Sequence, residues 1–381
     1  MAKMNPGFLN LKKSYLFIEI GKRVREYIAA HPDNKIIKMG IGDVTQPLAP
    51  VVVEAMKKAA DEMGVKETFR GYEDSGKGYD FLREAVAGYY KSFGVTVSPE
   101  EVLISDGAKS DCGNIGDIFS ENEDVVVTDP AYPVYVDSNV MGGRTVHYVN
   151  STEDNGFAAM PDESMKPGLI YLCSPNNPTG SVYTKEQLKV WVDYAIKNKS
   201  VIIFDAAYEA FISDETLPRS IFQIEGARKC AIEICSLSKT AGFTGTRCGY
   251  TVIPEELMLE TPTGEEISFM QLWCRRQGSK FNGVSYPVQR AAEAVFTEEG
   301  YKQTRATIAY YMQNAKVMSE TFYEIGITYT FRKNSEYFWC HYHYRIESFT
   351  FLHTLLNAAY VSGRAGARIG EYADGWLRPT E

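Results

Sequence analysis

The sequence predicts an α/β protein in which helices cover both faces of a mainly parallel sheet. Two observations support this class. Short apolar runs rich in branched side chains alternate with helical patterns along the middle of the chain. These runs are almost continuously apolar, as in strands buried on both faces. The five predicted strands are residues 101–105, 124–128, 168–173, 200–204 and 231–235.

Helical stretches fill the intervals between these strands. Residues 184–197 show amphipathic spacing, and Thr184 with Gln187 forms the capping-box pattern that starts a helix. No internal repeat or low-complexity linker interrupts the chain, so a second unit must be built from both chain ends around a continuous middle. The predicted domains are a large one at residues 45–285 and a small one made of residues 1–44 and 286–381.

The composition describes an ordinary globular protein rather than a disordered or membrane protein. Of the 381 residues, 44% are hydrophobic and 23% are charged, and no apolar run is long enough to cross a bilayer. The net charge of −9 argues against a nucleic-acid partner, because binding to phosphates needs a basic surface. The chain opens without the pattern of a signal peptide, so we expect a cytoplasmic protein without a membrane partner.

The cysteine and histidine residues indicate neither disulfides nor a metal centre. The seven cysteines show no CxxC spacing, which is typical of reduced thiols in an intracellular protein. His341 and His343 could share one face of a strand, but the sequence offers no further ligands near them. We therefore expect no metal site.

A polar loop follows each of the five predicted strands. In an open α/β sheet, ligands bind beyond the carboxyl ends of the strands, so five such loops would meet at one crevice. The loops are residues 106–109 (DGAK), 129–132 (DPAY), 174–177 (SPNN), 205–208 (DAAY) and 236–239 (SLSK).

Lys239 stands between small hydroxyl side chains and a nearby arginine. The segment 236–243 reads SLSKTAGF, and Arg247 follows it in the sequence GTR. A lysine in this setting suits a Schiff-base linkage to an aldehyde cofactor that also carries a phosphate. The motif becomes specific in combination with SPNNPTG at 174–180 and VIIFDAAY at 201–208.

These three segments, in this order, resemble the pyridoxal-phosphate-dependent aminotransferases of fold type I. The resemblance implies a large domain with a mainly parallel seven-stranded sheet flanked by helices, and a smaller α+β domain from both chain ends. It also implies pyridoxal 5′-phosphate as cofactor, small-molecule substrates that are amino acids and 2-oxo acids, and a homodimer with shared active sites.

The resemblance assigns roles around the pyridoxal ring. Lys239 carries the cofactor and moves the substrate α-proton, while Tyr208 and Asn177 donate hydrogen bonds to the phenolate oxygen. Asp205 ends an apolar run, so its buried carboxylate needs a cationic partner, which the pyridinium nitrogen supplies. Tyr132 matches the aromatic side chain that stacks on the ring. The catalytic residues predicted in this way are Lys239, Asp205 and Tyr208.

The phosphate site is expected at the start of a helix. Free N–H groups and the helix dipole attract an anion there, and residues 107–110 (GAKS) could open such a helix. In the family, the arginine matching Arg247 holds the phosphate, and the tyrosine matching Tyr72 reaches the phosphate of the neighbouring subunit. The predicted cofactor contacts are Tyr72, Ala108, Lys109, Tyr132, Asn177, Asp205, Tyr208, Ser236, Ser238, Lys239, Arg247 and Asn282.

Further segments narrow the resemblance to the LL-diaminopimelate aminotransferases. They are residues 10–17 (NLKKSYLF), 40–48 (GIGDVTQPL), 105–112 (SDGAKSDC) and 242–247 (GFTGTR). The implied reaction moves an amino group between LL-2,6-diaminopimelate and 2-oxoglutarate to give tetrahydrodipicolinate and glutamate, or runs in the reverse direction towards lysine. The implied substrate contacts are Tyr15, Gly42, Lys109, Tyr132, Asn177, Asn282 and Arg378.

The substrate half of the predicted site departs from the family pattern in two places. The family often has a glutamate shortly after the tyrosine at position 72, where it contacts the distal ammonium. Here the register is shifted, which leaves Glu73 or Asp74 for that contact. Arg378 matches the arginine that binds the α-carboxylate, but the sequence stops three residues later, whereas relatives continue into a further helix.

Three alternatives share the predicted cofactor residues. The first is a broader aromatic, alanine or glutamate aminotransferase, or a β-eliminating lyase of the same fold. The second is a pyridoxal-binding regulatory module of the kind fused to DNA-binding domains, although no basic helix-turn-helix pattern is found here. The third is a cofactor-binding protein with little activity, which an altered C-terminal segment would explain.

Overall fold

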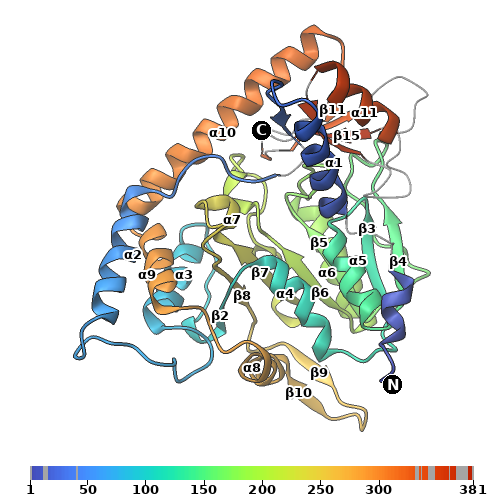
Figure 1. Ribbon diagram of the computed structural model, residues 1–381. Coiled ribbons are helices and arrows are strands. Elements are labelled where there is room, and N and C mark those ends of the chain that lie inside the picture. Colours follow the sequence, from blue (N-terminus) through green and yellow to red (C-terminus); the bar gives the residue numbers. More distant parts are fainter. Residues whose placement is uncertain are drawn as a thin grey trace.

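A seven-stranded sheet forms the centre of the molecule (Figure 1). The structure is a computed structural model that describes residues 2–11, 16–39, 42–330, 334–335, 337–341, 348–359, 361–365 and 376–379. The strands lie in the order β2-β8-β7-β6-β5-β3-β4. They are β2 (Val102–Ser105), β3 (Val125–Asp129), β4 (Val146–Asn150), β5 (Leu169–Cys173), β6 (Val201–Asp205), β7 (Ala231–Ser236) and β8 (Gly249–Val252).

The sheet is mainly parallel, as predicted. Strands β4, β3, β5, β6 and β7 run parallel to one another, whereas β8 is antiparallel to both β7 and β2. Two antiparallel steps restore the direction, so β2 ends at the same edge of the sheet as β7. The carboxyl ends of the five predicted strands therefore meet at one edge, which is where α/β sheets bind ligands.

All five predicted strands are confirmed, and each is buried along its whole length. Two strands of this sheet were not predicted. Strand β4 lies at the edge and is partly exposed, so its sequence VHYVN lacks the continuous apolar character of the others. Strand β8 has only four residues and follows directly on the turn that contains Arg247.

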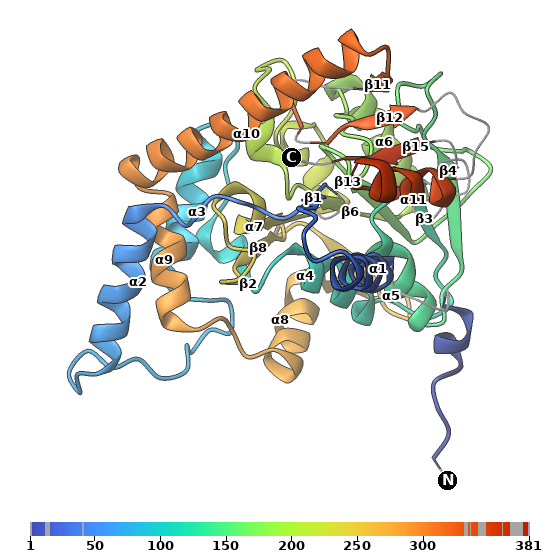
Figure 2. The same ribbon diagram turned by 45° about the horizontal axis from the view of Figure 1, so that its top comes forward.

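Helices cover both faces of the sheet (Figures 1 and 2). The predicted helix is α6, and its capping box is present, with Gln187 N donating to Thr184 Oγ1 at 3.2 Å and Thr184 N donating to Gln187 Oε1 at 2.9 Å. One apolar core joins the sheet to α2 (Pro50–Met63), α3 (Asp80–Lys91), α6 (Lys185–Asn198) and α9 (Tyr286–Val295). A second core joins the opposite face to α4 (Ala108–Asn114), α5 (Pro133–Met141) and α8 (Phe269–Lys280).

A second sheet has four antiparallel strands in the order β11-β12-β15-β14. The long helix α10 (Glu298–Glu324) connects the two sheets, because it contacts α2 and α9 as well as β11 (Figure 1). The four strands are β11 (Thr328–Thr330), β12 (Trp339–His341), β14 (Arg364–Ala365) and β15 (Trp376–Arg378), and α11 (Ser348–Ala359) packs next to them.

Segments from the two ends of the chain lie together (Figure 2). Strand β1 (Ile37–Lys38) pairs in parallel with β13 (Val361–Ser362), and α1 (Leu16–Ala30) precedes it. Tyr311 on α10 accepts hydrogen bonds at its Oη from Thr45 N and Gln46 N, each at 2.9 Å. The N-terminal segment is therefore tied both to α10 and to the C-terminal part.

None of the helices among the described residues has the length and apolar character needed to cross a lipid bilayer.

The remaining described elements are short. The short elements are the hairpin of β9 (Met258–Glu260) and β10 (Glu266–Ser268), the turn α7 (Leu237–Thr240), and the 3-10 helices η1 (Pro6–Asn10), η2 (Pro99–Glu101), η3 (Ile115–Ile118), η4 (Glu209–Phe211), η5 (Ile221–Gln223) and η6 (Ala227–Lys229).

Candidate active site

A cavity of about 200 Å³ lies at the carboxyl edge of the large sheet. The loops after β2, β3, β5, β6 and β7 all contribute to its wall, so the predicted meeting of five loops is confirmed. Strand β15 of the smaller sheet contributes as well. The predicted site residues that line the cavity are Gly42, Ala108, Lys109, Tyr132, Asn177, Asp205, Tyr208, Ser236, Ser238, Lys239, Arg247 and Arg378.

Lys239 lies on α7, a single helical turn that follows β7 directly. Ser236 caps this turn, because its Oγ accepts a hydrogen bond from Ser238 N at 3.1 Å. The lysine is half-buried and lines the cavity. Its amine is thus placed to bond an aldehyde held between the loops.

Asp205 ends β6 and is buried, with 4% of its surface exposed. Its Oδ2 accepts hydrogen bonds from Tyr135 Oη at 2.6 Å and from Cys112 Sγ at 3.6 Å, and its Oδ1 accepts one from Ala207 N at 3.0 Å. Burial raises the pKa of this carboxyl group. A cation in the cavity would offset that burial and hold the group ionised, because an opposite charge favours the charged form.

Tyr208 and Asn177 are both buried in the wall of the same cavity. Asn177 Nδ2 donates a hydrogen bond to Tyr208 Oη at 3.3 Å. Arg378 Nη1 donates to Asn177 Oδ1 at 2.7 Å. The three side chains therefore form one connected polar group, with the amide of Asn177 oriented by its two partners.

A corner of the cavity collects donors suited to an anion. Arg247 Nη1 donates to Ser238 Oγ at 3.1 Å, and Arg247 has the unusual positive φ of 68°. Gly107, immediately before α4, has a φ of +128°, and a Cβ atom there would lie 2.8 Å from Arg247 Nη2 and 3.6 Å from Ser236 Oγ. Only glycine lets the backbone approach these donors so closely. A guanidinium, two serine hydroxyls and the start of a helix suit a phosphate group.

Tyr132 is half-buried and precedes the first residue of α5. Its ring meets Tyr135 edge-on, with the centroids 5.7 Å apart and an interplanar angle of 77°. Tyr132 lines the same cavity as Asp205, and Tyr135 contacts both residues. This placement suits the predicted stacking on a flat ring that Asp205 binds.

Arg378 is 1% exposed although it lies near the end of the chain, on β15. Its Cζ stands 4.5 Å from the centroid of the Tyr337 ring, an arrangement in which the ring face attracts the cation. A planar guanidinium in a cavity wall is suited to bind a carboxylate. The departure of the C-terminal segment from the family pattern thus does not keep this arginine out of the cavity.

Two predicted site residues among those that the structure describes, Tyr72 and Asn282, do not line the cavity. Tyr72 is 86% exposed, and Asn282 is also exposed, with a positive φ of 68° after α8. Tyr15 lies outside the described residues. Glu73 uses its carboxylate within its own loop, where it accepts hydrogen bonds from Ser75 N at 2.6 Å and Gly78 N at 3.1 Å.

The sequence did not identify several residues that line the cavity. The most consequential are Tyr135, which donates to Asp205, and Tyr337, whose Oη donates to Tyr208 Oη at 2.5 Å. Tyr135 could have been found, because it lies only three residues after Tyr132, in the first turn of α5. Tyr337 carries no local signal. The other residues that line the cavity without having been predicted are Cys173, Ala207 and Thr244.

The groups present fit pyridoxal 5′-phosphate. The fit rests on a buried carboxylate that needs a cation, an anion corner that excludes a Cβ atom at Gly107, and an amine on the turn between them. Asp205 would hold the ring nitrogen, Arg247 the phosphate and Lys239 the aldehyde carbon. The cavity thus offers one suitable group for each of the three polar parts of this molecule, which are the ring nitrogen, the phosphate and the aldehyde.

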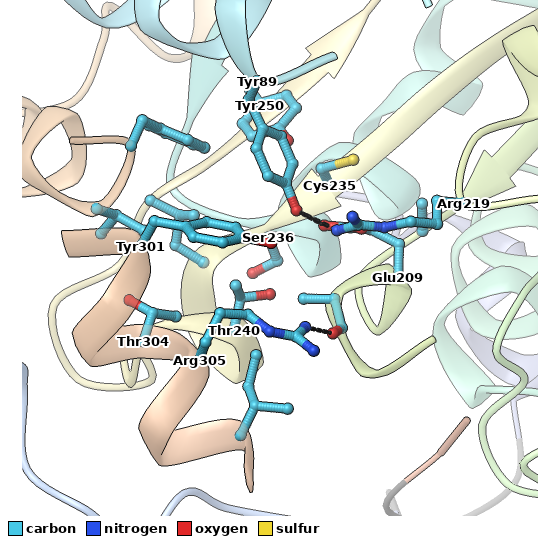
Figure 3. A pocket seen from close by; sticks show the side chains of 16 residues that line it. Tyr89, Glu209, Arg219, Cys235, Ser236, Thr240, Tyr250, Tyr301, Thr304 and Arg305 are labelled. Atoms are coloured by element: carbon cyan, nitrogen blue, oxygen red, sulfur yellow. Dashed lines mark hydrogen bonds and ion pairs between the residues drawn. The ribbon is translucent and has the colours of Figure 1, made fainter. Parts of the chain in front are cut away.

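A second cavity, of about 20 Å³, borders the lysine turn and is lined by Ser236 and Thr240 among others (Figure 3). Glu209 reaches into its wall between Tyr89 and Arg219. Arg219 Nη2 lies 2.6 Å from Glu209 Oε2, and Tyr89 Oη donates to Glu209 Oε1 at 2.7 Å. Glu209, Arg219 and Tyr89 thus bind one another. We therefore regard this small cavity as a packing gap next to the candidate active site and not as a second site.

The fold and the site together define a fold type I protein, with the lysine after one central strand and the aspartate after the neighbouring strand. The family model for aminotransferase class I and II matches residues 34–378. A curated LL-diaminopimelate aminotransferase of Parabacteroides distasonis is 50% identical over 392 residues, which cover 100% of this chain and 95% of the relative. The chain belongs to the class I and II aminotransferase family, whose members depend on pyridoxal phosphate, and it is an aminotransferase.

Solved structures agree with this assignment. The L,L-diaminopimelate aminotransferase from Chlamydomonas reinhardtii superposes with a TM-score of 0.91 at 36% identity and covers 100% of this chain and 94% of its own. The substrate-bound BacF structure from Bacillus subtilis gives a TM-score of 0.85 at 25% identity, with coverage of 100% and 93%. The predicted resemblance to aminotransferases of fold type I is therefore confirmed.

Proposed function

We propose that this protein is an LL-diaminopimelate aminotransferase that holds pyridoxal 5′-phosphate on Lys239. The observation that carries the proposal is the 50% identity to the Parabacteroides distasonis enzyme along the entire chain. The cavity supports it, because it combines the lysine with donors for a phosphate and with a buried arginine for a carboxylate. The reaction transfers an amino group between LL-2,6-diaminopimelate and 2-oxoglutarate, in the direction of tetrahydrodipicolinate and glutamate or the reverse.

The cofactor, when bound, supplies a ring that accepts the electron pair released at the substrate Cα atom. Asp205 would hold the ring nitrogen and favour its protonated form, since a carboxylate buried with its own hydrogen bonds favours a cation beside it. Lys239 would hold the aldehyde carbon, and its amine would move the proton at the substrate Cα atom. Both residues therefore act on the same small group of atoms from adjacent strand ends.

Arg378 binds the substrate α-carboxylate in this proposal. Its guanidinium is oriented by Asn177 Oδ1 on one side and by the face of Tyr337 on the other. A second carboxylate substrate, 2-oxoglutarate, can use the same arginine in the second half of a ping-pong reaction. One fixed cation thus serves both substrates.

The distal end of the substrate needs a carboxylate partner for its ammonium group. Glu73 is held by the N–H groups of Ser75 and Gly78, whereas Asp74 is exposed beside it. We infer that Asp74 is the better candidate for the distal contact, because its carboxylate does not cap the loop as Glu73 does. Asp74→Asn should raise the KM for LL-diaminopimelate and leave the KM for 2-oxoglutarate unchanged.

We also propose a homodimer in which Tyr72 and Asn282 complete the partner's site. Both side chains are exposed and lie outside the cavity of their own chain. The helices that follow their two loops are in contact, because Tyr79 N donates to Gln289 Oε1 at 2.9 Å and the rings of Tyr79 and Tyr286 are 5.3 Å apart. The exposed apolar side chains of Val65 (49%) and Phe69 (58%) belong to the segment just before Tyr72. Covering them in a dimer would remove apolar surface from water.

A subunit-mixing experiment tests the shared site. Lys239→Ala and Tyr72→Ala are each expected to have little activity as pure proteins. In a hybrid dimer, one site combines both defects, while the other has an intact Lys239 and receives an intact Tyr72 from its partner. Mixing and reassociating the two variants should therefore restore activity. A mixture that stays as inactive as its parts would contradict the shared site.

The proposed activity is tested with purified protein, LL-diaminopimelate and 2-oxoglutarate. We expect tetrahydrodipicolinate and glutamate as products, and none from Lys239→Ala. Brisk transamination of phenylalanine or alanine without turnover of LL-diaminopimelate would show a broader aminotransferase instead. Release of ammonia and a 2-oxo acid from a single substrate would show a lyase. We further propose a cytoplasmic location, and a division of the chain into residues 45–285 and residues 1–44 with 286–381.

A further inference from the structure

Two segments of the chain carry the residues that complete the partner's site in the proposed dimer. Tyr72 lies between α2 and α3, and Asn282 lies between α8 and α9. The side chain of Tyr72 is 86% exposed, and Asn282 is exposed as well. Residues 64–79 form the tyrosine loop, and residues 281–285 form the asparagine loop. Because both loops enter the same site of the partner in this dimer, their separation must match that site.

Gln289 joins the ends of the two loops. It lies on α9 and is 1% exposed. Its Oε1 accepts a hydrogen bond from Tyr79 N at 2.9 Å, at the end of the tyrosine loop. Its Nε2 donates to Val284 O at 2.8 Å, in the asparagine loop. A carboxamide holds its acceptor and its donors in one plane, so this single buried side chain sets the position of one loop relative to the other.

Helix α9 also holds the start of the tyrosine loop, because it contacts both α2 and α3 (Figure 1). Tyr286 is the first residue of α9, and its Oη donates to Glu62 Oε2 at 2.5 Å near the end of α2. Arg290 Nε donates to the same Oη at 3.1 Å. The rings of Tyr286 and Tyr79 meet edge-on, with their centroids 5.3 Å apart. The tyrosine loop is therefore fastened to α9 both before and after its exposed part.

The tyrosine loop is closed on itself at the side chain of Tyr79. Its Oη donates to Gly71 O at 3.1 Å, which ties the residue before Tyr72 to the end of the loop. The backbone also approaches Gln289 closely, since a Cβ atom on Gly78, which has a φ of +102°, would lie 3.1 Å from Gln289 Oε1. A shift at Gln289 is therefore carried to Tyr72 through Tyr79.

We propose that Gln289 is a positioning residue that acts across the dimer, by setting the tyrosine loop and the asparagine loop for the partner's site. The inference rests on the proposed homodimer with shared sites. Gln289 does not line the cavity of its own chain, and it acts through Tyr79 and Val284. Its loss should therefore impair the site of the partner and spare the site of its own subunit.

Hybrid dimers purified through two different affinity tags test this direction of action. Gln289→Met keeps the length of the side chain and removes both hydrogen bonds. In the first hybrid, a Lys239→Ala subunit pairs with a Gln289→Met subunit, so the working site belongs to the Gln289→Met subunit and receives intact loops. In the second hybrid, a subunit with both substitutions pairs with an unsubstituted one, so the working site is unsubstituted and receives the altered loops.

The second hybrid should show the defect and the first should not. The reference is a hybrid of Lys239→Ala with an unsubstituted subunit. Relative to it, we expect kcat/KM of the second hybrid to fall about tenfold. The affinity for the cofactor at Lys239, measured by visible absorbance titration without substrate, should fall as well, because Tyr72 reaches the phosphate from the partner. A merely structural role of Gln289 would weaken the first hybrid at least as much as the second.

Gln223 provides a matched control. Its Oε1 accepts from Arg219 N at 2.7 Å and its Nε2 donates to Phe93 O at 3.1 Å, so it also joins two segments of the chain. Neither segment carries a residue predicted to reach the partner, so Gln223→Met should leave both hybrids at the reference level. Tyr79→Phe is a second variant, which removes only the hydroxyl group that donates to Gly71 O. It should lower kcat/KM about threefold in place of Gln289→Met in the second hybrid.

Two results would overturn the inference. One is a loss in the first hybrid that equals or exceeds the loss in the second, and the other is a second hybrid with the kcat/KM and cofactor affinity of the reference. If Gln289→Met subunits do not assemble, the same comparison with Tyr79→Phe decides. The shared site has its own test in the mixture of Lys239→Ala with Tyr72→Ala. Recovery of activity in that mixture, together with either result, would contradict the role of Gln289 and leave the proposed dimer in place.

Discussion

Replacing Arg219 with methionine should destabilise the protein strongly, because it leaves a buried carboxylate without its cation. Arg219 lies against Glu209 (Figure 3), with Nη2 2.6 Å and Nε 2.9 Å from Oε2. It also covers the ring of Phe93 at 5.0 Å. The side chains of Glu209 and Arg219 are only 8% and 19% exposed. Breaking one partner of such a buried pair costs about 3 to 5 kcal/mol.

The surface pair of Lys197 and Glu163 provides a matched control. Its N–O distance is also 2.6 Å, but its side chains are 66% and 64% exposed. Lys197→Met should change the free energy of unfolding by less than about 1 kcal/mol, because water screens exposed pairs. The comparison isolates burial, since the charges and the distance are alike in the two pairs.

Urea denaturation at neutral pH measures both variants. The double variant Arg219→Met with Glu209→Gln should recover much of the stability lost in Arg219→Met, because it removes the unpaired charge. Glu209 directly follows Tyr208, so Arg219→Met should also reduce the affinity for the cofactor. A loss in Arg219→Met no larger than that in Lys197→Met would refute this reasoning.

Three further predictions concern the site and its surroundings. Lys239→Ala should abolish the visible absorbance of the cofactor while the circular dichroism of the protein stays the same. Gly107→Ala should weaken cofactor binding at least about tenfold, measured by absorbance titration, because its Cβ atom would lie 2.8 Å from Arg247 Nη2 at a φ of +128°. Burial raises the pKa of Glu233 from 4.5 to about 7, so the folded state holds this proton more tightly than the unfolded chain does. Stability should therefore fall as the pH rises through this interval, and Glu233→Gln should flatten the fall in denaturation series from pH 5 to 8.

Local sequence patterns were sufficient for the core of the sheet. The strand that ends at Asp205 and the strand that ends at Ser236 are continuous apolar runs, and such runs identify strands buried on both faces. The loops after them could be assigned to one edge because parallel strands end on the same side. The edge strand β4 escaped prediction, since half-exposed residues such as those of Val146–Asn150 lack this apolar signature.

The part of the site that holds the cofactor was also accessible from the sequence. Lys239, Asp205 and Arg247 each carry their chemistry in residue type and in a short motif, and the structure brings all three to one cavity. Asn282 shows the limit of this reasoning. Its sequence motif predicts a contact with the cofactor, but the side chain is exposed and does not line the cavity of its own chain. Which site such a residue completes depends on the assembly.

Tertiary structure alone decided which side chains hydrogen-bond to the predicted site residues. Tyr337 donates to Tyr208 from 129 residues away in the chain, and Arg378 donates to Asn177 from 201 residues away. A buried polar group gains its partner through the packing of distant elements, and no motif of neighbouring residues records that pairing. The sequence therefore determined the strands and the chemistry at their ends, whereas the fold determined which donors orient that chemistry.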